Sequence, residues 1–280
     1  MVIIGSIVAA ACAIGSAACS ACCAVGAAIS GAIAAVGGTV AGFCSAISTI
    51  GAGIAAAAST IGTTLAVAGK AICTAITTFI AQFPKLDLKQ IIEIVKTAFE
   101  IIQAVATILG IGDGEDQEEL GERALQHPEI KRENFDSEQA YIEALKQAEF
   151  KKGNIQDGMP AEGHRWLCRT IGASIQIRAI SEKLRMSTPM DFFLDCAKIG
   201  LKAKGIYDGE GNGVLEKLSA AGVKDAGDLS VCLRDGIDPS DADDRSTLQQ
   251  IERALDTGST GATNMSMSFG DMKRAYENGK

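Results

Sequence analysis

The sequence predicts an all-α protein in which long hydrophobic N-terminal helices rich in Ala, Gly and Ile precede an amphipathic helix and a small soluble helical domain. Three observations support this prediction. All 34 Asp and Glu residues and 25 of the 26 Lys and Arg residues lie after position 84, so Lys70 is the single charged side chain before it. Large apolar residues recur at steps of three and four, the spacing of one helix face. The sequence offers no alternating run long enough to indicate a strand.

Residues 1–84 have the composition of a close-packed helical assembly. They contain 25 Ala but only one Leu, whereas an ordinary core uses Leu heavily. A surface made of this segment would be one large uncharged patch, so lipid, other copies of the chain or another protein must cover it. Small residues let helix backbones approach closely, as in the small-xxx-small spacing of Gly38 and Gly42.

The large residues of this segment form a regular stripe. From position 29 to position 54 they follow one another at alternating steps of four and three, which keeps one helix face turned toward a partner. We predict that this stripe and two small residues beside it form a homo-oligomer interface. The predicted interface residues are Ile29, Ile33, Val36, Gly38, Val40, Gly42, Phe43, Ile47, Ile50 and Ile54.

The same 84 residues are long enough for two or three membrane spans of about 20 residues each. A three-span arrangement would cover residues 2–24, 27–50 and 54–80. Many Gly, Ser and Thr residues dilute the favourable insertion energy, and no Trp or Tyr anchors the ends. Both a cooperatively inserted bundle and a protein polymer without lipid are compatible with this composition. Lys70 and Lys85 favour a cytoplasmic location for the region that follows.

Composition divides the chain into four segments. Residues 1–84 form the hydrophobic assembly or membrane segment, and residues 85–112 form an amphipathic linker helix whose start is capped by Asp87. Residues 113–257 form an acidic soluble helical domain, and residues 258–280 form a loosely ordered tail. A fragment containing residues 85–280 is therefore expected to fold by itself.

Caps and apolar periodicity predict several helices in the soluble part. They cover residues 137–150, 161–185, 214–221 and 246–255, with a short helical end near 271–276. A further helix is opened by the Thr-x-x-Asp pattern of residues 188–191 and runs to about residue 204.

The sequence contains no convincing catalytic or metal site. His164 lies one helical turn before Cys168, which would allow a thiol–imidazole pair, but the sequence assigns no orienting carboxylate. The segment from Asp208 to Gly213 resembles the start of a calcium loop, yet Ser219 stands where the closing Glu is needed. The nine cysteines do not form a metal pattern and are expected to be reduced thiols that pack as small apolar residues. No cofactor is expected, and the acidic balance argues against a nucleic-acid partner.

These observations favour a self-assembling, membrane-embedded homo-oligomer, such as a pore or a membrane-remodelling assembly, whose partners are other copies of the chain and the lipid bilayer. A structural subunit of a helical filament or tube, with the N-terminal helices as the polymer core, is the first alternative. A membrane-anchored enzyme of unknown type is the second. The absence of a set of acid, base and nucleophile leads us to expect that the chain is not an enzyme.

Overall fold

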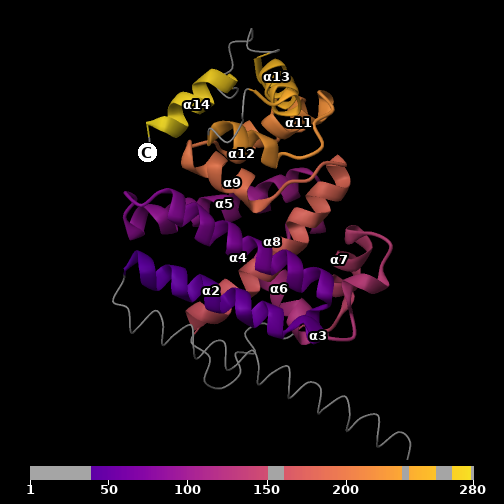
Figure 1. The fold of residues 1–280 in the computed structure, drawn as a ribbon. Coiled ribbons are helices and arrows are strands. Elements are labelled where there is room, and N and C mark those ends of the chain that lie inside the picture. The colour runs from indigo at the N-terminus through magenta and orange to yellow at the C-terminus, as the bar shows by residue number, and fades with distance from the viewer. Residues whose placement is uncertain (1–38, 151–160, 235–239, 257–266, 279–280) are drawn as a thin grey trace, which may run out of the picture. The chain divides into compact units, whose positions relative to one another are not determined.

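In the computed structural model, the residues whose structure is described are 39–150, 161–234, 240–256 and 267–278. Every regular element in these ranges is a helix, and the sole β-type pairing there is an isolated bridge between Ser187 and Asp225. The prediction of an all-α fold is confirmed. Figure 1 shows the helices in chain order.

Contacts divide the chain into two compact units. The first contains residues 1–77 and 116–175, and the second contains residues 78–115 and 176–280. This division differs from the one based on composition, because the hydrophobic helices before residue 77 pack with later, charged helices. A fragment beginning at residue 85 would therefore lack one side of the first unit.

The first unit is built from hydrophobic helices and later amphipathic ones. Its described elements are α2 (Val40–Ala56), α3 (Ala58–Ile61), the first part of α4 (Thr63–Gln82), α6 (Gln117–Gln126), the 3-10 helix η2 (Arg132–Asn134), α7 (Glu138–Gln147) and the first part of α8 (Ala161–Leu184). Thr39 begins α2 by accepting a hydrogen bond from the Gly42 N–H through its side chain. Gly62 separates α3 from α4 because its φ of +89° is a conformation that favours glycine.

Two glycines set the distance between α6 and α8. A Cβ atom on Gly121 would lie 1.9 Å from the Cys168 carbonyl oxygen, and a Cβ atom on Gly172 would lie 1.9 Å from that of Gln117. The two helices therefore touch backbone to backbone, and any side chain at either glycine would force them apart.

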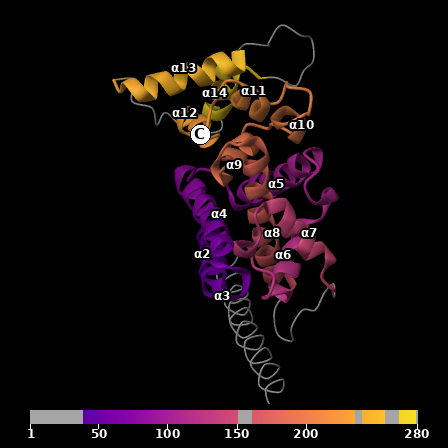
Figure 2. The same cartoon turned by 90° about the vertical axis from the view of Figure 1, so that its right-hand side faces the viewer.

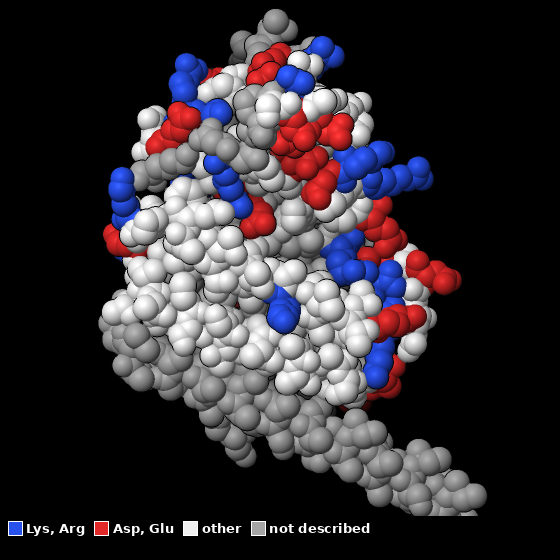
Figure 3. Space-filling view, in the orientation of Figure 1, with Lys and Arg blue, Asp and Glu red and all other residues white. Residues whose placement is uncertain are grey.

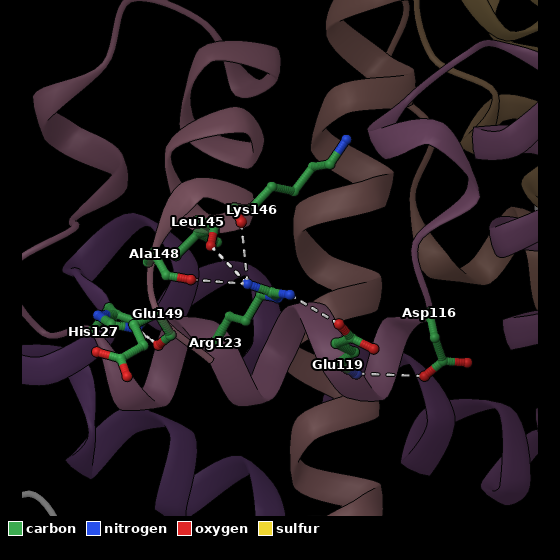
Figure 4. A network of polar contacts seen from close by, with 8 residues as sticks. All are labelled: Asp116, Glu119, Arg123, His127, Leu145, Lys146, Ala148 and Glu149. Carbon is green, nitrogen blue, oxygen red and sulfur yellow. Dashed lines mark hydrogen bonds and ion pairs between the residues drawn. The ribbon is translucent and has the colours of Figure 1, made fainter. Parts of the chain in front are cut away.

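Arg123 ties α6 to the end of α7 (Figure 4). Its guanidinium donates to the carbonyl oxygens of Leu145, Lys146 and Ala148 at 3.2–3.3 Å, and it pairs with Glu119 at 3.0 Å. Carbonyl groups at a helix end lack partners within the helix, so a cation there is stabilising. This contact adds to the packing of Tyr141, Ile142 and Leu145 of α7, which are fully buried.

The second unit is centred on α5 (Leu88–Ile108), which packs against α9 (Met190–Lys198) and α10 (Ala203–Ile206). Asp87 and Gln90 form the capping box that begins α5, as the cap residue in the sequence predicts. The remaining described helices of this unit are α11 (Val214–Ala220), α12 (Gly227–Leu233), α13 (Ala242–Asp256) and α14 (Phe269–Glu277), together with the 3-10 helix η1 (Gly112–Gly114) and the last turns of α4 and α8.

Most predicted helices lie close to their predicted bounds, with one clear difference. The helix expected from a Thr188 cap to about residue 204 begins at Met190 after Pro189 and ends at Lys198, and a second short helix, α10, follows. Gly200 separates the two because its φ of +79° cannot continue a right-handed helix.

Candidate assembly surface on helices α2 and α4

Helices α2 and α4 lie side by side in the first unit (Figures 1 and 2). Their contact is close, because a Cβ atom on Gly51 would lie 3.1 Å from the Cys73 Cβ, and one on Gly69 would lie 3.0 Å from the Ile54 Cγ2. Glycines at these positions let each helix accept the side chains of the other. The small-residue composition of the segment thus acts within one chain in the first instance.

The predicted interface residues that lie on α2 are mostly covered by the chain itself. Ile47 and Ile50 are each 1% exposed, Ile54 is fully buried, and Gly42 is buried as well. Phe43 is partly exposed and packs edge to face on Trp166 of α8, with ring centroids 5.9 Å apart. Packing within the chain accounts for the regular spacing of these residues.

The other predicted interface residues give no structural test. Val40 is half-buried at the first turn of α2. Ile29, Ile33, Val36 and Gly38 lie outside the described residues. A homo-oligomer contact through the large-residue stripe stays a prediction.

The outward face of α2 and α4 is small and uncharged apart from one lysine. Figure 3 shows a broad surface without acidic side chains over these helices. The largest exposed apolar side chain on it is Val67, which is 70% exposed. The exposed residues of this face, called here the small-residue face, are Ala41, Ser45, Ser48, Ala52, Ala55, Ala56, Val67, Lys70, Ala71 and Thr74.

A groove of about 280 Å³ runs along the small-residue face between the two helices. It is lined by Ser48, Gly51, Ala52 and Ala55 from α2 and by Lys70, Cys73, Thr74 and Thr77 from α4. The hydroxyl groups of Thr74 and Thr77 donate to carbonyl oxygens of their own helix, at 3.1 and 2.9 Å. These two hydroxyls are satisfied locally, so a small-residue helix that covers the groove would not strand them, provided that the Lys70 ammonium, which also lines the groove, keeps its contact with water.

Glu133 of η2 caps the first turn of α4 from 69 positions away in the sequence. Its Oε1 atom accepts hydrogen bonds from the Thr64 N–H at 2.8 Å and from the Thr63 hydroxyl at 3.0 Å. Burial by itself raises the pKa of Glu133, but these hydrogen bonds outweigh that effect and lower the pKa to about 2. The folded state therefore favours the ionised carboxylate at the positive end of the α4 dipole.

Replacing Glu133 with Gln is expected to lower the thermal midpoint of unfolding by an amount that depends on pH. A depressed folded-state pKa contributes stability above the unfolded value near 4.5 and loses it as the pH falls through about 2. The difference in midpoint between the wild type and the variant should therefore be largest above pH 5 and shrink toward pH 2.5. Calorimetry over this range checks the prediction, and a difference that does not vary with pH would contradict it.

His164 and Cys168 meet, but not in the arrangement that thiol catalysis needs. The His164 Nε2 atom lies 3.4 Å from the Cys168 Sγ and 4.0 Å from the Glu122 Oε1, so the thiol and the carboxylate approach the same ring nitrogen. A catalytic relay places them on opposite nitrogens. Burial lowers the pKa of His164, against the effect of Glu122 and Glu118, and Cys168 is 2% exposed. The thiol is thus buried beside a partly buried imidazole, an arrangement suited to packing.

The loop that resembles a calcium site uses its carboxylates on its own backbone. Asp208 Oδ1 accepts from the N–H groups of Glu210 and Asn212, and the Glu216 carboxylate accepts from the N–H groups of Asp208, Gly211 and Gly213. These bonds make a rigid turn that begins α11. No group of three or more potential metal ligands occurs among the described residues.

One helix in the described ranges could cross a membrane by length and composition. This is α4, with 20 residues and a mean hydropathy of 1.6. A buried core helix of a soluble protein passes the same test, and 44% of the apolar window of α4 is buried inside the chain. The helix is therefore compatible with either environment.

Searches against protein-family models, curated protein sequences and solved structures find no match to this chain.

Proposed function

We propose that this chain is a self-assembling membrane protein. In this proposal the uncharged residues 1–38 enter the bilayer, copies of the chain pack through the small-residue face of α2 and α4, and the acidic helical remainder stays in water on the cytoplasmic side. The assembly would serve as a pore or as a membrane-remodelling coat. Catalysis has no part in this proposal.

The small-residue face is the observation that carries the proposal. Most large apolar side chains of α2 and α4 point into the chain, which leaves an outward face of Ala, Ser and Thr, together with Val67 and Lys70, and a groove between the helices. Small side chains let a helix of another copy approach closely, and contact there buries no carboxylate, because residues 39–84 contain none.

The sequence before the described helices supports the membrane component. Residues 1–38 contain no charged side chain and exceed the roughly 20 residues that one span requires. Helix α4 is a second candidate span, although its large apolar residues already have partners within the chain. Residues 1–38 are therefore the first segment expected in lipid.

The filament or tube is a second candidate, favoured by the burial of large apolar side chains of α4 within the chain. Leu65, Ile72 and Ile76 on α4 are each no more than 3% exposed, so the described part of the chain needs no lipid to cover them. Copies joined through the small-residue face could then form an ordered polymer in water.

Replacing Ala52 with Glu is expected to abolish assembly of the full-length protein without unfolding it. Ala52 is exposed and lines the groove. A charged side chain at this position contacts water in the monomer, but it would be buried when two copies pack together. The oligomer mass is measured by native mass spectrometry or light scattering after reconstitution into liposomes. The variant should give monomers, with a loss in association of at least about tenfold.

Ala140→Glu is the matched control. Ala140 is also exposed and helical, but it lies on α7, which contributes no residue to the lining of the groove, so this variant should assemble as the wild type does. Equal assembly by A52E and A140E would reject the small-residue face as the interface. Flotation with liposomes and resistance to carbonate extraction support the membrane assembly. If the protein does not float with liposomes and forms ordered particles in electron micrographs of lipid-free samples, the filament is supported and the membrane assembly is rejected.

A further inference from the structure

The C-terminal helix α14 holds the end of α4 through an aromatic and cationic cluster. The Phe83 ring, which follows the last residue of α4, meets the Tyr276 ring edge to face at 5.5 Å and the Phe79 ring at 4.8 Å between centroids. The Lys198 Nζ atom lies 4.5 Å from the Phe83 centroid and 4.1 Å from the Tyr276 centroid. The same ammonium donates to the Tyr276 carbonyl oxygen at 2.6 Å.

This cluster is supported by a buried ion pair. The carboxylate of Asp195 of α9, which is 1% exposed, forms an ion pair with Arg234 at 2.9 Å, and Asp191 lies 3.6 Å from the same guanidinium nitrogen. Burial raises the pKa of Asp195 to about 6, although Arg234 opposes the rise. Burial and the Asp195 charge raise the pKa of the Tyr276 hydroxyl, which places this hydroxyl beside the ion pair. Tyr276 thus links α14 to both the ion pair and Phe83.

Helix α14 has the properties of an element that can detach. It has nine residues, and isolated helices shorter than about 12 residues are not stable in water. Within the second unit it packs against α12 and α13. A helix of this length stays folded only while it is docked, and such a local unit can open while the other helices persist.

We propose that α14 is a reversible latch. Its docking through Tyr276 and Lys198 keeps Phe83 and the end of α4 covered, and its release exposes them and promotes assembly. The last step rests on the proposed function. Release would uncover the Phe83 ring, which directly follows α4 in the sequence, and would add apolar surface for contact with lipid or another copy. The device places control of the N-terminal helices at the opposite end of the chain.

Hydrogen exchange of the full-length protein, followed by mass spectrometry, tests the latch. Tyr276→Ala should raise the exchange rate at least about tenfold in peptides covering residues 78–86, because it removes the ring contact and the cation–π contact together. Peptides covering residues 42–56 should keep their protection. Glu277→Ala, at the exposed neighbouring position, is the control and should change neither.

Two further variants keep the test decisive. Tyr276→Phe retains the ring and removes the hydroxyl, so it should restore most of the protection that Tyr276→Ala loses. If Tyr276→Ala unfolds the whole chain, Lys198→Met takes its place, because it removes only the ammonium group. Unchanged exchange at residues 78–86 in the variant that stays folded would overturn the latch.

Assembly of the same variants separates the latch from the proposed function. Faster assembly of Tyr276→Ala than of the wild type supports the coupling. Equal assembly of the two, with faster exchange at residues 78–86, would reject the coupling and leave the proposed function in place. If neither the wild type nor any variant assembles, the proposed function and its coupling to the latch are rejected. The exchange result would still decide whether α14 acts as a latch.

Discussion

Replacing Gly172 with Ala is expected to destabilise the first unit by about 3 kcal/mol. The added Cβ atom would lie 1.9 Å from the Gln117 carbonyl oxygen, which is part of the backbone of α6 and cannot rotate away. The helices must separate, and the contacts along their shared surface are lost. Urea unfolding followed by the fluorescence of Trp166, the single Trp of the chain, reports on this unit.

Gly270→Ala makes the same chemical change where space is open. A Cβ atom there would meet only the Ser268 Oγ at 4.0 Å, so replacing a helical glycine should leave stability unchanged or raise it by up to about 1 kcal/mol. Because Gly270 lies in the second unit, its effect is followed by far-ultraviolet circular dichroism. A Gly172→Ala protein with the urea midpoint of the wild type would show that α6 and α8 do not cross at this distance.

Replacing Ile47 with Asp is expected to unfold the first unit or to destabilise it by at least about 3 kcal/mol. Ile47 is 1% exposed, so the new carboxylate would be buried without a partner in a site that isoleucine fills. The measurement is the same urea titration on Trp166, carried out at protein concentrations low enough to keep the chain monomeric.

Ser48→Asp is the control for this experiment. Ser48 is the next residue in the sequence but is exposed at the groove, so an aspartate there should leave the fold of the monomer intact. If Ile47→Asp folds as stably as the wild type and fails only to assemble, the stripe faces another copy. The packing of α2 within the chain would then have to be revised.

Local features of the sequence determine much of the secondary structure. Asp87 directly precedes α5 and Gln90 lies in its first turn, and Gly213 directly precedes α11. The starts of these two helices can therefore be predicted from the sequence. Caps act over three or four residues, which is why they can be recognised without knowledge of the fold. The sequence does not predict α6, because this helix lies at an acidic stretch from Asp113 to Glu122, although Asp116 caps it. The sequence does not predict α12 either, because this helix begins without a capping side chain.

Tertiary structure decides what the predicted stripe contacts. The spacing of Ile47, Ile50 and Ile54 establishes that they share a helix face, but a shared face fits packing within the chain as well as packing between copies. In the folded chain these residues are buried, and the small residues between them form the outward face. The candidate assembly surface is thus the exposed face of the helix, which the stripe of large residues does not occupy.

The long-range partners could not be read from the sequence either. Glu133 caps a helix that begins 70 positions before it, and Gly121 and Gly172 lie 51 positions apart, so no local pattern links them. Composition alone determined that residues 1–84 must be covered, because an uncharged surface of that size is unfavourable in water. Which helices cover them depends on shape complementarity between segments distant in the chain, and that is settled only when the chain folds.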